Sequence, residues 1–558
     1  MFVRIKTTPN SPKKAVQIVE SVRVGATVKQ KIIRHIGQAL DDEELGLLKA
    51  LAESILRKLE TENQPCLFAP EELAASQKVL LTEEHALVHL TDLTEEQRVI
   101  DGIHDVYGAL FDTFGFGDVI AHPSRHQASV RMLRDVVMAR IANPQSKRAS
   151  VHMLEQDFGI TLDLQQVYRM MDRLDERAIA AINRIAYDQT RSLFQGKIDV
   201  VFYDATTLYF EAFEEDELRK CGFSKDLKFN QPQVLLALMV TKEGLPVGYK
   251  LFPGNTFEGH TLIPTLTEIR TQYDLDNVVF VADSGLFNQA NLDELEQHGF
   301  HYIVGARIKN LPATLTKTLL DTSLYTPLCA GTQVAELAFN GRRLIVTHKE
   351  KRAAKDARDR ARGIERLRKK LTTSANVKDQ LSNHGYRKFL RVTGDSSLSI
   401  DEAKLAEASQ WDGLHGIITH SDLSAAEALA QYHNLWQVEN AFRVTKHDLK
   451  VRPIFHWKKE RIQAHLAISF MAYTLVQHLT YRVRLQHQPM SVEAIRKVLL
   501  RVQTSIYRDT RKKVRYGLPN PLSPDAAKIY RIVQIKPVRT PYILHAASHQ
   551  TQSTSSEM

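Results

Sequence analysis

Between residues 198 and 306, short apolar runs of strand length alternate with amphipathic stretches of helical length. Residues 198–204 and 278–283 are mostly apolar and end in a carboxylate, Asp204 and Asp283, as a buried strand followed by a polar end would. The same patterns predict further strands at 231–241, 246–252 and 301–306 and helices at 258–273 and 289–298. The order of three strands, helix, strand, helix, strand predicts a mixed α/β fold.

The N-terminal third has a different pattern. Residues 1–62 predict a small β/α unit, with strands at 16–24 and 27–33 followed by an amphipathic helix. Residues 63–95 contain Pro65, Pro70 and several acids and predict a linker. Residues 96–194 predict a helical domain, whose short helices would occupy 127–142, 147–157 and 164–175. Basic residues among these helices fit either a DNA-binding domain or a bundle with solvated charges.

Residues 307–410 interrupt the α/β order. Strands are expected at 333–339 and 343–348, before a charged stretch. Residues 341–370 hold 13 Lys or Arg against four acids, a net charge of +9 that equals the excess of the whole chain. The pattern then predicts a strand at 414–419, a helix at 423–447 and further helix to about residue 503. Residues 504–558 form a C-terminal segment whose Ser/Thr/Gln-rich tail is expected to be disordered.

Composition narrows the class of protein. The 558 residues are 43% hydrophobic and 25% charged, which excludes wholesale disorder and predicts several domains. Cys66, Cys221 and Cys329 lie far apart and form no C-x-x-C pair, as expected for a reducing cytoplasm without a zinc ribbon. The N-terminus lacks a signal-peptide core, and the apolar stretch 466–479 is too short to span a bilayer. A soluble cytoplasmic protein with a buried helix at 466–479 is expected.

Three carboxylates stand where chemistry is expected. Asp204 and Asp283 close buried strands, and Glu439 lies in the helix predicted at 423–447. Ligands gather at strand ends of open α/β sheets, and converging carboxylates need a cation such as Mg²⁺ or Mn²⁺ between them. The alternative is that the aspartates are turn or cap residues and that Glu439 is a solvated charge.

Glu439 belongs to a stripe with a seven-residue spacing. Tyr432, Glu439 and Lys446 would share one helix face, and Arg443 follows Glu439 by one turn. Such a helix could hold a metal ion with the glutamate and phosphate oxygens with the other side chains. An exposed, salt-bridged face is the alternative explanation.

With these residues the chain resembles the DDE transposases of bacterial insertion sequences, in the branch with a Tyr-x₂-Arg-x₃-Glu-x₆-Lys signature. Tyr432, Glu439 and Lys446 match that spacing, whereas the Arg position holds Leu435. The two aspartates match in Tyr-Asp-Ala at Asp204 and Val-Ala-Asp at Asp283. The resemblance covers about residues 197–480, and the N-terminal unit with the helical region resembles the long subgroup of the family.

The resemblance implies an α/β RNase H-like catalytic core formed by residues 195–306 and 411–503. Residues 307–410 would be a basic inserted domain, and the small β unit and the helical domain would precede the core. Asp204, Asp283 and Glu439 would bind Mg²⁺, with Mn²⁺ as a substitute, and would catalyse cleavage of element ends and joining of the 3′-OH ends to target DNA. Tyr432, Arg443 and Lys446 would bind DNA phosphates near the cleaved bond. The excess of positive charge in the basic stretch indicates that Arg342, Arg343, Lys349, Lys351 and Arg352 bind DNA as well, the alternative being a solvated helix with internal salt bridges.

The resemblance also implies the partners, which are double-stranded DNA, as terminal inverted repeats and as target, and a second copy of the chain in a synaptic homodimer. No membrane partner is expected, and the protein would act in the bacterial cytoplasm on the nucleoid. Trp411 and Trp436 are candidates for stacking on an extruded base, although each is more simply a core aromatic. Two alternative functions stay open: an inactive or domesticated relative that only binds DNA, and an RNase H-like nuclease without strand transfer.

Overall fold

The computed structural model describes residues 90–544 except 212–213, 223–229, 274–277, 287–288, 330, 374–384 and 394–396. Before residue 90 it describes residues 2–7, 14–24, 27–39 and 79–80 and scattered helical residues between 42 and 56. The chain divides into two compact units, residues 1–80 and 81–558. Most of the predicted linker and the predicted disordered tail lie outside the described residues.

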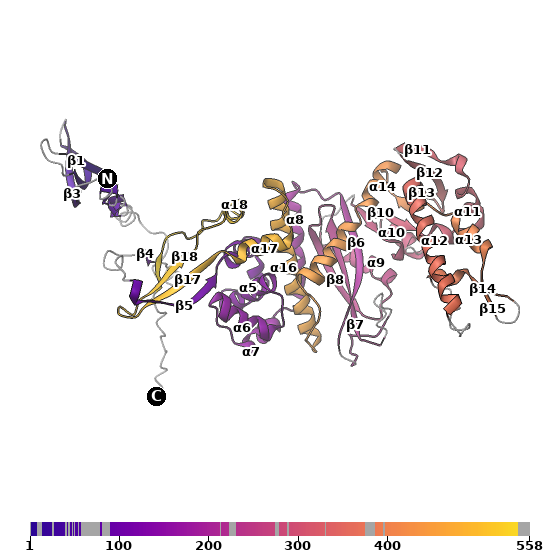
Figure 1. The fold of residues 1–558 in the computed structure, drawn as a ribbon, viewed down its shortest axis with the longest axis horizontal. Helices are drawn as coiled ribbons and strands as arrows, with labels where there is room; N and C mark the ends of the chain where they lie inside the picture. Colours follow the sequence, from indigo (N-terminus) through magenta and orange to yellow (C-terminus); the bar gives the residue numbers. More distant parts are fainter. Residues whose placement is uncertain are drawn as a thin grey trace. The chain divides into compact units, whose positions relative to one another are not determined.

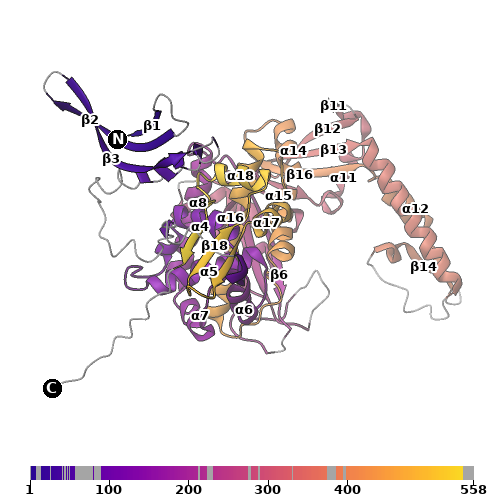
Figure 2. The same ribbon diagram turned by 60° about the vertical axis from the view of Figure 1, so that its left-hand side comes forward.

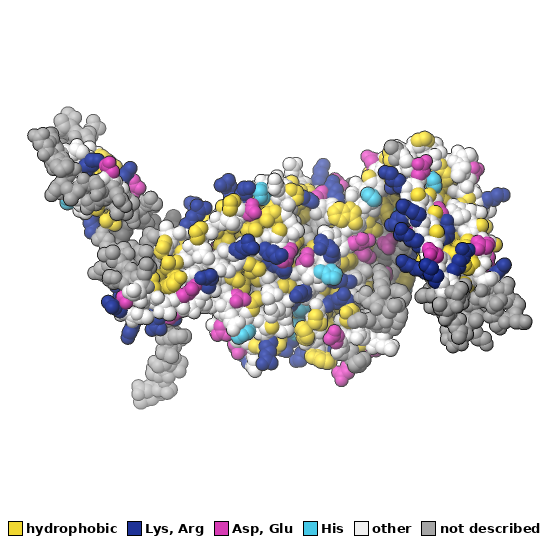
Figure 3. All heavy atoms as spheres, viewed as in Figure 1, with side chains coloured by type: hydrophobic (Ala, Val, Ile, Leu, Met, Phe, Trp, Pro, Cys, Tyr) yellow, Lys and Arg dark blue, Asp and Glu magenta, His cyan; other side chains and the backbone are white. Residues whose placement is uncertain are grey.

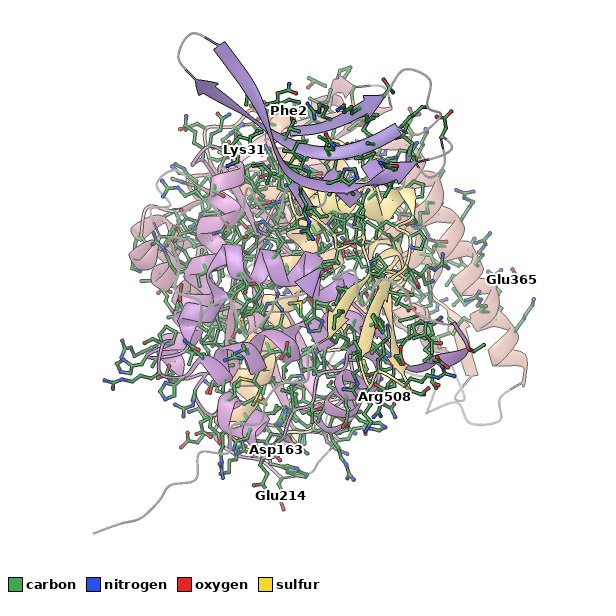
Figure 4. All side chains as sticks on the ribbon, turned by 90° about the vertical axis from the view of Figure 1, so that its left-hand side faces the viewer. Phe2, Lys31, Asp163, Glu214, Glu365 and Arg508 are labelled. Carbon is green, nitrogen blue, oxygen red and sulfur yellow. The ribbon has the colours of Figure 1, made fainter. Side chains whose placement is uncertain are left out.

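The first unit is built on an antiparallel sheet. Its strands are β1 (Phe2–Thr7), β2 (Lys14–Val24) and β3 (Thr27–Ala39), in the order β1-β2-β3, so the strand prediction for this region is confirmed. Figure 4 shows this sheet with Phe2 on β1 and Lys31 on β3. Val16, Ile18 and Val19 of β2 are fully buried against Ala52, which gives the unit its own small core.

A nine-stranded mixed sheet organises the second unit (Figure 1). Its first five strands in sequence are β6 (Val200–Tyr209), β7 (Gln233–Thr241), β8 (Pro246–Pro253), β9 (Val279–Ala282) and β10 (His301–Ala306). The strand order across the sheet is β11-β12-β13-β16-β10-β9-β6-β7-β8. The pairs β6–β9 and β9–β10 are parallel, and the pairs β6–β7 and β7–β8 are antiparallel. The predicted mixed α/β order is therefore confirmed.

The two faces of this sheet pack against different helices. Val201, Tyr203 and Ala205 of β6 belong to a core with α9 (Leu262–Gln272) and α10 (Gln289–Gln297). The alternate residues Phe202 and Leu208 belong to a second core, which contains residues of α15 (Trp436–Arg443) and α16 (Lys459–Gln486). Because side chains along a strand point alternately to the two faces, Asp204 and Thr206 lie on the α15 and α16 face.

The helices between residues 102 and 193 pack around α16 in the same core. They are α4 (Gly102–Phe114), α5 (Gln127–Ala142), α6 (Lys147–Phe158), α7 (Leu164–Met171) and α8 (Glu176–Leu193). Ser146, Asp163 and Asp175 cap the last three by accepting a bond from the backbone N–H three residues on. The short helices predicted here are confirmed. Packing on α16 accounts for the apolar faces of these helices, and the two alternatives for their charged residues, DNA binding or a solvated bundle, both stay open.

The boundaries of this helical region differ from the prediction at residue 96. Residues 93–100 form a strand, β5 (Leu93–Ile100), which pairs with β17 (Gln503–Asp509) of the C-terminal segment. The same sheet continues through β18 (Arg515–Pro519) to β19 (Tyr542–Leu544). In sequence, α17 (Val492–Leu500) precedes β17, and α18 (Pro524–Ile532) connects β18 to β19. The local pattern predicts helix at 96–100, because these residues become a strand only by pairing with β17, which lies about 400 residues further along the chain.

The segment 307–410 contributes to the central sheet. After α11 (Ala313–Leu319), its strands β11 (Thr326–Cys329), β12 (Thr332–Phe339) and β13 (Arg342–Lys349) extend the sheet beyond β16 (Leu414–His420). The chain then continues as α12 (Glu350–Thr373), β14 (Leu390–Thr393), β15 (Ser397–Ile400) and α13 (Glu402–Ser409). Figure 2 shows α12 as a long helix leading away from the sheet towards β14.

The predicted buried helix at 466–479 is part of α16, where residues 464–479 are all buried. Among the described helices, none is long and apolar enough to cross a membrane.

Candidate active site

Asp204 lies inside β6, which runs on to Tyr209, so the prediction that it closes a strand is wrong, whereas Asp283 directly follows β9 as predicted. The two aspartates nevertheless lie at the same level of two adjacent parallel strands. Tyr203 of β6 is paired with Ala282 of β9, so the two aspartates occupy the next step of the register. Neighbouring strands run about 4.8 Å apart, which brings the two carboxylates side by side. Val281 belongs to the core of the α15 and α16 face, so Asp283 points to the same face as Asp204. Asp204 is half-buried and Asp283 is exposed.

Gly305 of β10 lies at the same level, beside Asp283. Val304 pairs with Ala282, which places Gly305 opposite Asp283 across the parallel pair. A Cβ atom on Gly305 would collide with the Tyr432 hydroxyl and would lie 3.0 Å from the Ser284 backbone nitrogen. Glycine at this position therefore leaves the space that the Tyr432 side chain fills.

The helix predicted at 423–447 is divided in three. The structure has α14 (Ala425–His433), a turn at 434–435, α15, and a π-helical segment at Val444–Asp448. Leu435, which replaces the signature arginine, is half-buried in this turn and packs against the core. The continuous helix was expected because the apolar periodicity runs through the turn without a Gly or Pro to mark it.

Both ends of the predicted stripe touch the strands that carry the aspartates. The Tyr432 hydroxyl lies 3.5 Å from the Asp283 Oδ1 atom, and burial together with this carboxylate raises the pKa of Tyr432. Lys446 donates a hydrogen bond of 2.6 Å from Nζ to Thr206 Oγ1 on β6, two residues beyond Asp204. The segment from Tyr432 to Lys446 thus runs from the end of β9, next to Asp283, to the part of β6 that contains Asp204.

Glu439 lies in the middle of this segment, in the first turn of α15, and its side chain is exposed. The helix packs on β6 and β7, and the negative charge of Glu439 contributes to the raised pKa of Tyr432. Among the residues that the structure describes, no three His, Cys, Asp or Glu side chains are close enough together to form a metal site. The structure therefore sets Asp204 beside Asp283, and it packs α15, which contains Glu439, on the face of the sheet to which both aspartates point.

One residue that sequence reasoning did not place at the site, His415, also lies here. The ring of His415 on β16 lies 5.3 Å from that of Tyr432, and burial lowers the pKa of His415 to about 4. The positive charges of Arg352 and Lys349 lower this pKa further, whereas the charge of Asp283 raises it. The start of α12 is thus close to the aspartates. The antiparallel pairing of β13 with β16 creates this proximity, which no local sequence signal could reveal.

The other predicted DNA-binding residues have different surroundings. Arg443 is exposed and donates to Asn440 Oδ1, and Lys349, Lys351 and Arg352 are exposed at the start of α12. Arg343 donates to the backbone oxygens of residues 421 and 423 and pairs with Glu336.

Arg342 requires a correction. Its side chain is 1% exposed and pairs with Asp293 and Glu296 at 2.5 Å each. A guanidinium buried against two carboxylates cannot reach a DNA phosphate, so Arg342 has a structural role.

We expect the variant Arg342→Met to lower the free energy of unfolding by about 2 kcal/mol, since a buried ion pair loses one partner while the acids keep partial contact with water. Denaturant unfolding measures this change. The salt dependence of DNA binding should stay at the wild-type value. A weaker salt dependence of DNA binding in this variant would show that Arg342 contacts a DNA phosphate.

The basic stretch of the sequence is mostly an exposed helix surface. Figure 3 shows Lys and Arg side chains gathered over the region of α12. Arg360 pairs with Asp412 and Arg352 with Asp356. Other cations of α12 are exposed and form no ion pair with a described acid: Lys351, Lys355, Arg362 and Arg366.

The two tryptophans considered for base stacking differ in exposure. Trp436 at the start of α15 is 51% exposed, whereas Trp411 is half-buried, with the Lys309 ammonium 5.8 Å from its ring centre. Exposure leaves Trp436 as the better candidate for stacking.

Comparison with protein families gives two matches. Residues 195–475 match the family described as "Transposase DDE domain", and residues 3–66 match "IS1634 family transposase, N-terminal domain". The first match covers half of the chain and includes Asp204, Asp283 and Glu439. A search of curated proteins finds no match.

Solved structures with some similarity include a piggyBac transposase synaptic complex with hairpin DNA. Its identity is 9% and its TM-score 0.36, over 72% of this chain and 78% of that one. A Mos1 transposase paired-end complex with the left transposon end is 16% identical over 28% of this chain and 53% of that one, with a TM-score of 0.14. A Mos1 mariner paired-end complex with Mn is 13% identical over 36% and 72%, with a TM-score of 0.13. At these scores the structures add no argument to the family matches.

Proposed function

The chain belongs to the family of DDE-domain transposases of insertion sequences, and on that premise we propose that Asp204, Asp283 and Glu439 are its acidic triad. The observation that carries the proposal is the register of β6 and β9, which sets Asp204 beside Asp283 beneath the segment that contains Glu439. We further propose that β6–β10 with α15 form an RNase H-like core, into which residues 307–410 are inserted.

By the type of its atoms the donor set fits Mg²⁺ or Mn²⁺, and binding would draw the three carboxylates closer together than they lie in the described structure. An aspartate inside β6, an aspartate just after the adjacent β9 and a glutamate on α15 supply the hard oxygen ligands that these ions prefer. Bound there, the ions would supply activation of an attacking oxygen and stabilisation of a leaving one. Repulsion between Asp204 and Asp283 would be relieved at the same time.

The reaction has two steps in this proposal. A water oxygen forms a bond to phosphorus at the element end, the bond from phosphorus to the 3′ oxygen breaks, and that oxygen leaves as a 3′-OH. The 3′-OH then attacks a phosphodiester of the target, whose own 3′ oxygen leaves. Lys446 and Arg443 would hold phosphate oxygens, and Tyr432 would position the Asp283 carboxylate.

Gly305 provides a test of this positioning. We expect Gly305→Ala to lower the cleavage rate by about tenfold to a hundredfold, because the added methyl group displaces the Tyr432 hydroxyl and the peptide after Asp283. Cleavage of a labelled element end measures the rate. In a Tyr432→Phe background the same change should cost less, since the two residues share one contact. Equal costs in both backgrounds would contradict the role assigned to Tyr432.

DNA would be held by α12 as well as by the active site. We expect the triple variant Lys355→Gln, Arg362→Gln, Arg366→Gln to flatten the slope of log affinity against log salt by up to about 2.7, since each lost phosphate contact removes about 0.9. Binding titrations at several salt concentrations give the slope. The control variant Lys317→Gln, Lys404→Gln should keep the wild-type slope. An unchanged slope in the triple variant would remove α12 from the DNA-binding surface.

The partners would be terminal inverted repeats, target DNA and a second copy of the chain in the synaptic complex, on the bacterial nucleoid. Strand transfer with pre-cleaved ends tests the proposed function directly. Joined products are expected. Hydrolysed products alone would identify a nuclease of the same core, and end binding without either product would identify an inactive relative.

A further inference from the structure

A pocket outside the candidate active site lies between the helices α5 and α6 and the loop at 449–456, which follows the π-helical segment. It has a volume of about 280 Å³, far more than the ~30 Å³ of one water molecule. Side chains from these two helices, from α16 and from the loop line it. The six lining residues that bear on its charge and shape are Arg140, Lys147, Arg148, Phe455, His456 and His465.

Two of these basic side chains are buried without an acidic partner, and burial lowers the pKa of both, that of Lys147 well below its usual value, so that a bound anion would favour the charged form of Lys147. Arg140 is 4% exposed and Lys147 is 5% exposed. Arg140 donates to the backbone oxygens of Leu449 and Lys450 at 3.4 and 3.2 Å, and the Lys147 Nζ atom lies 3.5 Å from His465 Nδ1. Neither cation forms an ion pair with a described carboxylate. None of the described acids lines the pocket, and Asp172, four residues after the pocket-lining Tyr168, is bound by Arg461 through two bonds of 2.7 and 2.8 Å.

The surroundings add positive potential. Lys147 and Arg148 are the first two residues of α6, whose first turn contains no acid, so they stand at the positive end of the helix dipole. Burial and the nearby cations lower the pKa of His456 to about 3 and that of His465 well below its usual value, so both rings are neutral. Buried cations are ordinarily paired, and the residues that the structure describes supply no anion here.

We propose that this pocket binds a phosphate group of a DNA strand. Two buried cations, an exposed third and the N-terminus of α6 supply the charge and the donors that a phosphate needs. The Phe455 ring lines the same pocket and is 60% exposed, which suits contact with a deoxyribose or a base. The loop from Leu449 to His456 joins the pocket to Lys446, so the strand that leaves the active site would reach it. This inference rests on the proposed function for the identity of the strand.

The experiment compares wild-type protein with Lys147→Met, which replaces a buried charge by an apolar side chain of similar length, and with Arg148→Gln at the exposed edge. Lys528→Met on α18 is the control for a lost surface lysine. We expect Lys147→Met to weaken DNA binding roughly tenfold and to flatten the salt slope by about 0.9. Arg148→Gln should flatten it similarly, and the control should match wild type. Neutralising the one backbone phosphate that the pocket holds should weaken wild-type binding by the same factor and should have no effect on binding by Lys147→Met.

Thermal unfolding in inorganic phosphate and in chloride at equal ionic strength makes the pocket testable without DNA. Phosphate should raise the midpoint of the wild type and not that of Lys147→Met. If the wild type binds no DNA but is stabilised by phosphate, the proposed function fails and the anion site stands. If both pocket variants bind DNA with the wild-type slope, the assignment to a DNA phosphate is overturned. If phosphate also fails to stabilise the wild type, the pocket is not an anion site.

Discussion

Asp204→Ala is expected to bind element ends with wild-type affinity and to lose cleavage and strand transfer by about a thousandfold or more. Stabilisation of transition-state charge by a metal ion contributes several kcal/mol, and each 1.4 kcal/mol is a factor of ten in rate. Asp204 is half-buried on β6 with Asp283 as its lateral neighbour, so removing it leaves that neighbour without its partner ligand. Cleavage of a labelled end in Mg²⁺ and a parallel binding titration measure the two effects.

Asp199→Ala is the matched control for this variant. Asp199 is an exposed aspartate that directly precedes the first residue of β6. Its backbone oxygen accepts a hydrogen bond from the Val279 backbone N–H, and the substitution leaves this bond intact. It should retain wild-type cleavage. Strand transfer by Asp204→Ala at a rate within tenfold of the wild type would refute the assignment of Asp204, provided that both variants unfold at the wild-type temperature.

Glu439→Cys is expected to reverse the preference of the enzyme among divalent ions. With Mg²⁺ the rate should fall about a thousandfold, because a thiolate is a poor ligand for a hard ion. With Mn²⁺ or Cd²⁺, which accept sulfur ligands more readily, a substantial part of the activity should return. Rates of end cleavage across the three ions measure the change. Rescue of this kind distinguishes a metal ligand from a residue that only shapes the helix.

Glu407→Cys on α13 controls for thiol effects at an exposed site, in a chain that already contains three cysteines. It should keep the preference of the wild type for Mg²⁺. If Glu439→Cys shows equal losses with all three ions, Glu439 does not bind the metal, and the third ligand must be sought elsewhere.

Local patterns were sufficient for most of the strands. Residues 301–306 were predicted as a strand with the observed bounds, because a short apolar run between polar turns has few other buried arrangements. The pairing of β5 with β17 could not be predicted, since its energy comes from contacts between residues 93–100 and 503–509. The break at 434–435 was missed for a similar reason. Packing of α14 and α15 on different strands separates them, and the sequence between them has no helix-breaking residue.

In the candidate site, too, some residues could be predicted from local patterns and others could not. Asp283 could be proposed from a carboxylate at a strand end, and Glu439 from the spacing with Tyr432 and Lys446. Asp204 was proposed on the same ground although β6 continues beyond it, because the polar residues after Asp204 hide the second half of the strand. The roles of Gly305 and His415 depend on the register of β10 with β9 and of β13 with β16, which a single sequence does not contain. Arg342 was predicted to bind DNA because charge counts do not distinguish a buried pair from an exposed surface.

Anomalous diffraction from Mn²⁺ in crystals of the protein bound to an element end tests the central claim most directly. The account predicts manganese peaks that touch carboxylate oxygens of Asp204, Asp283 and Glu439 at one place. A peak held by the two aspartates while Glu439 stays beyond coordination distance, or peaks at other residues, would contradict it.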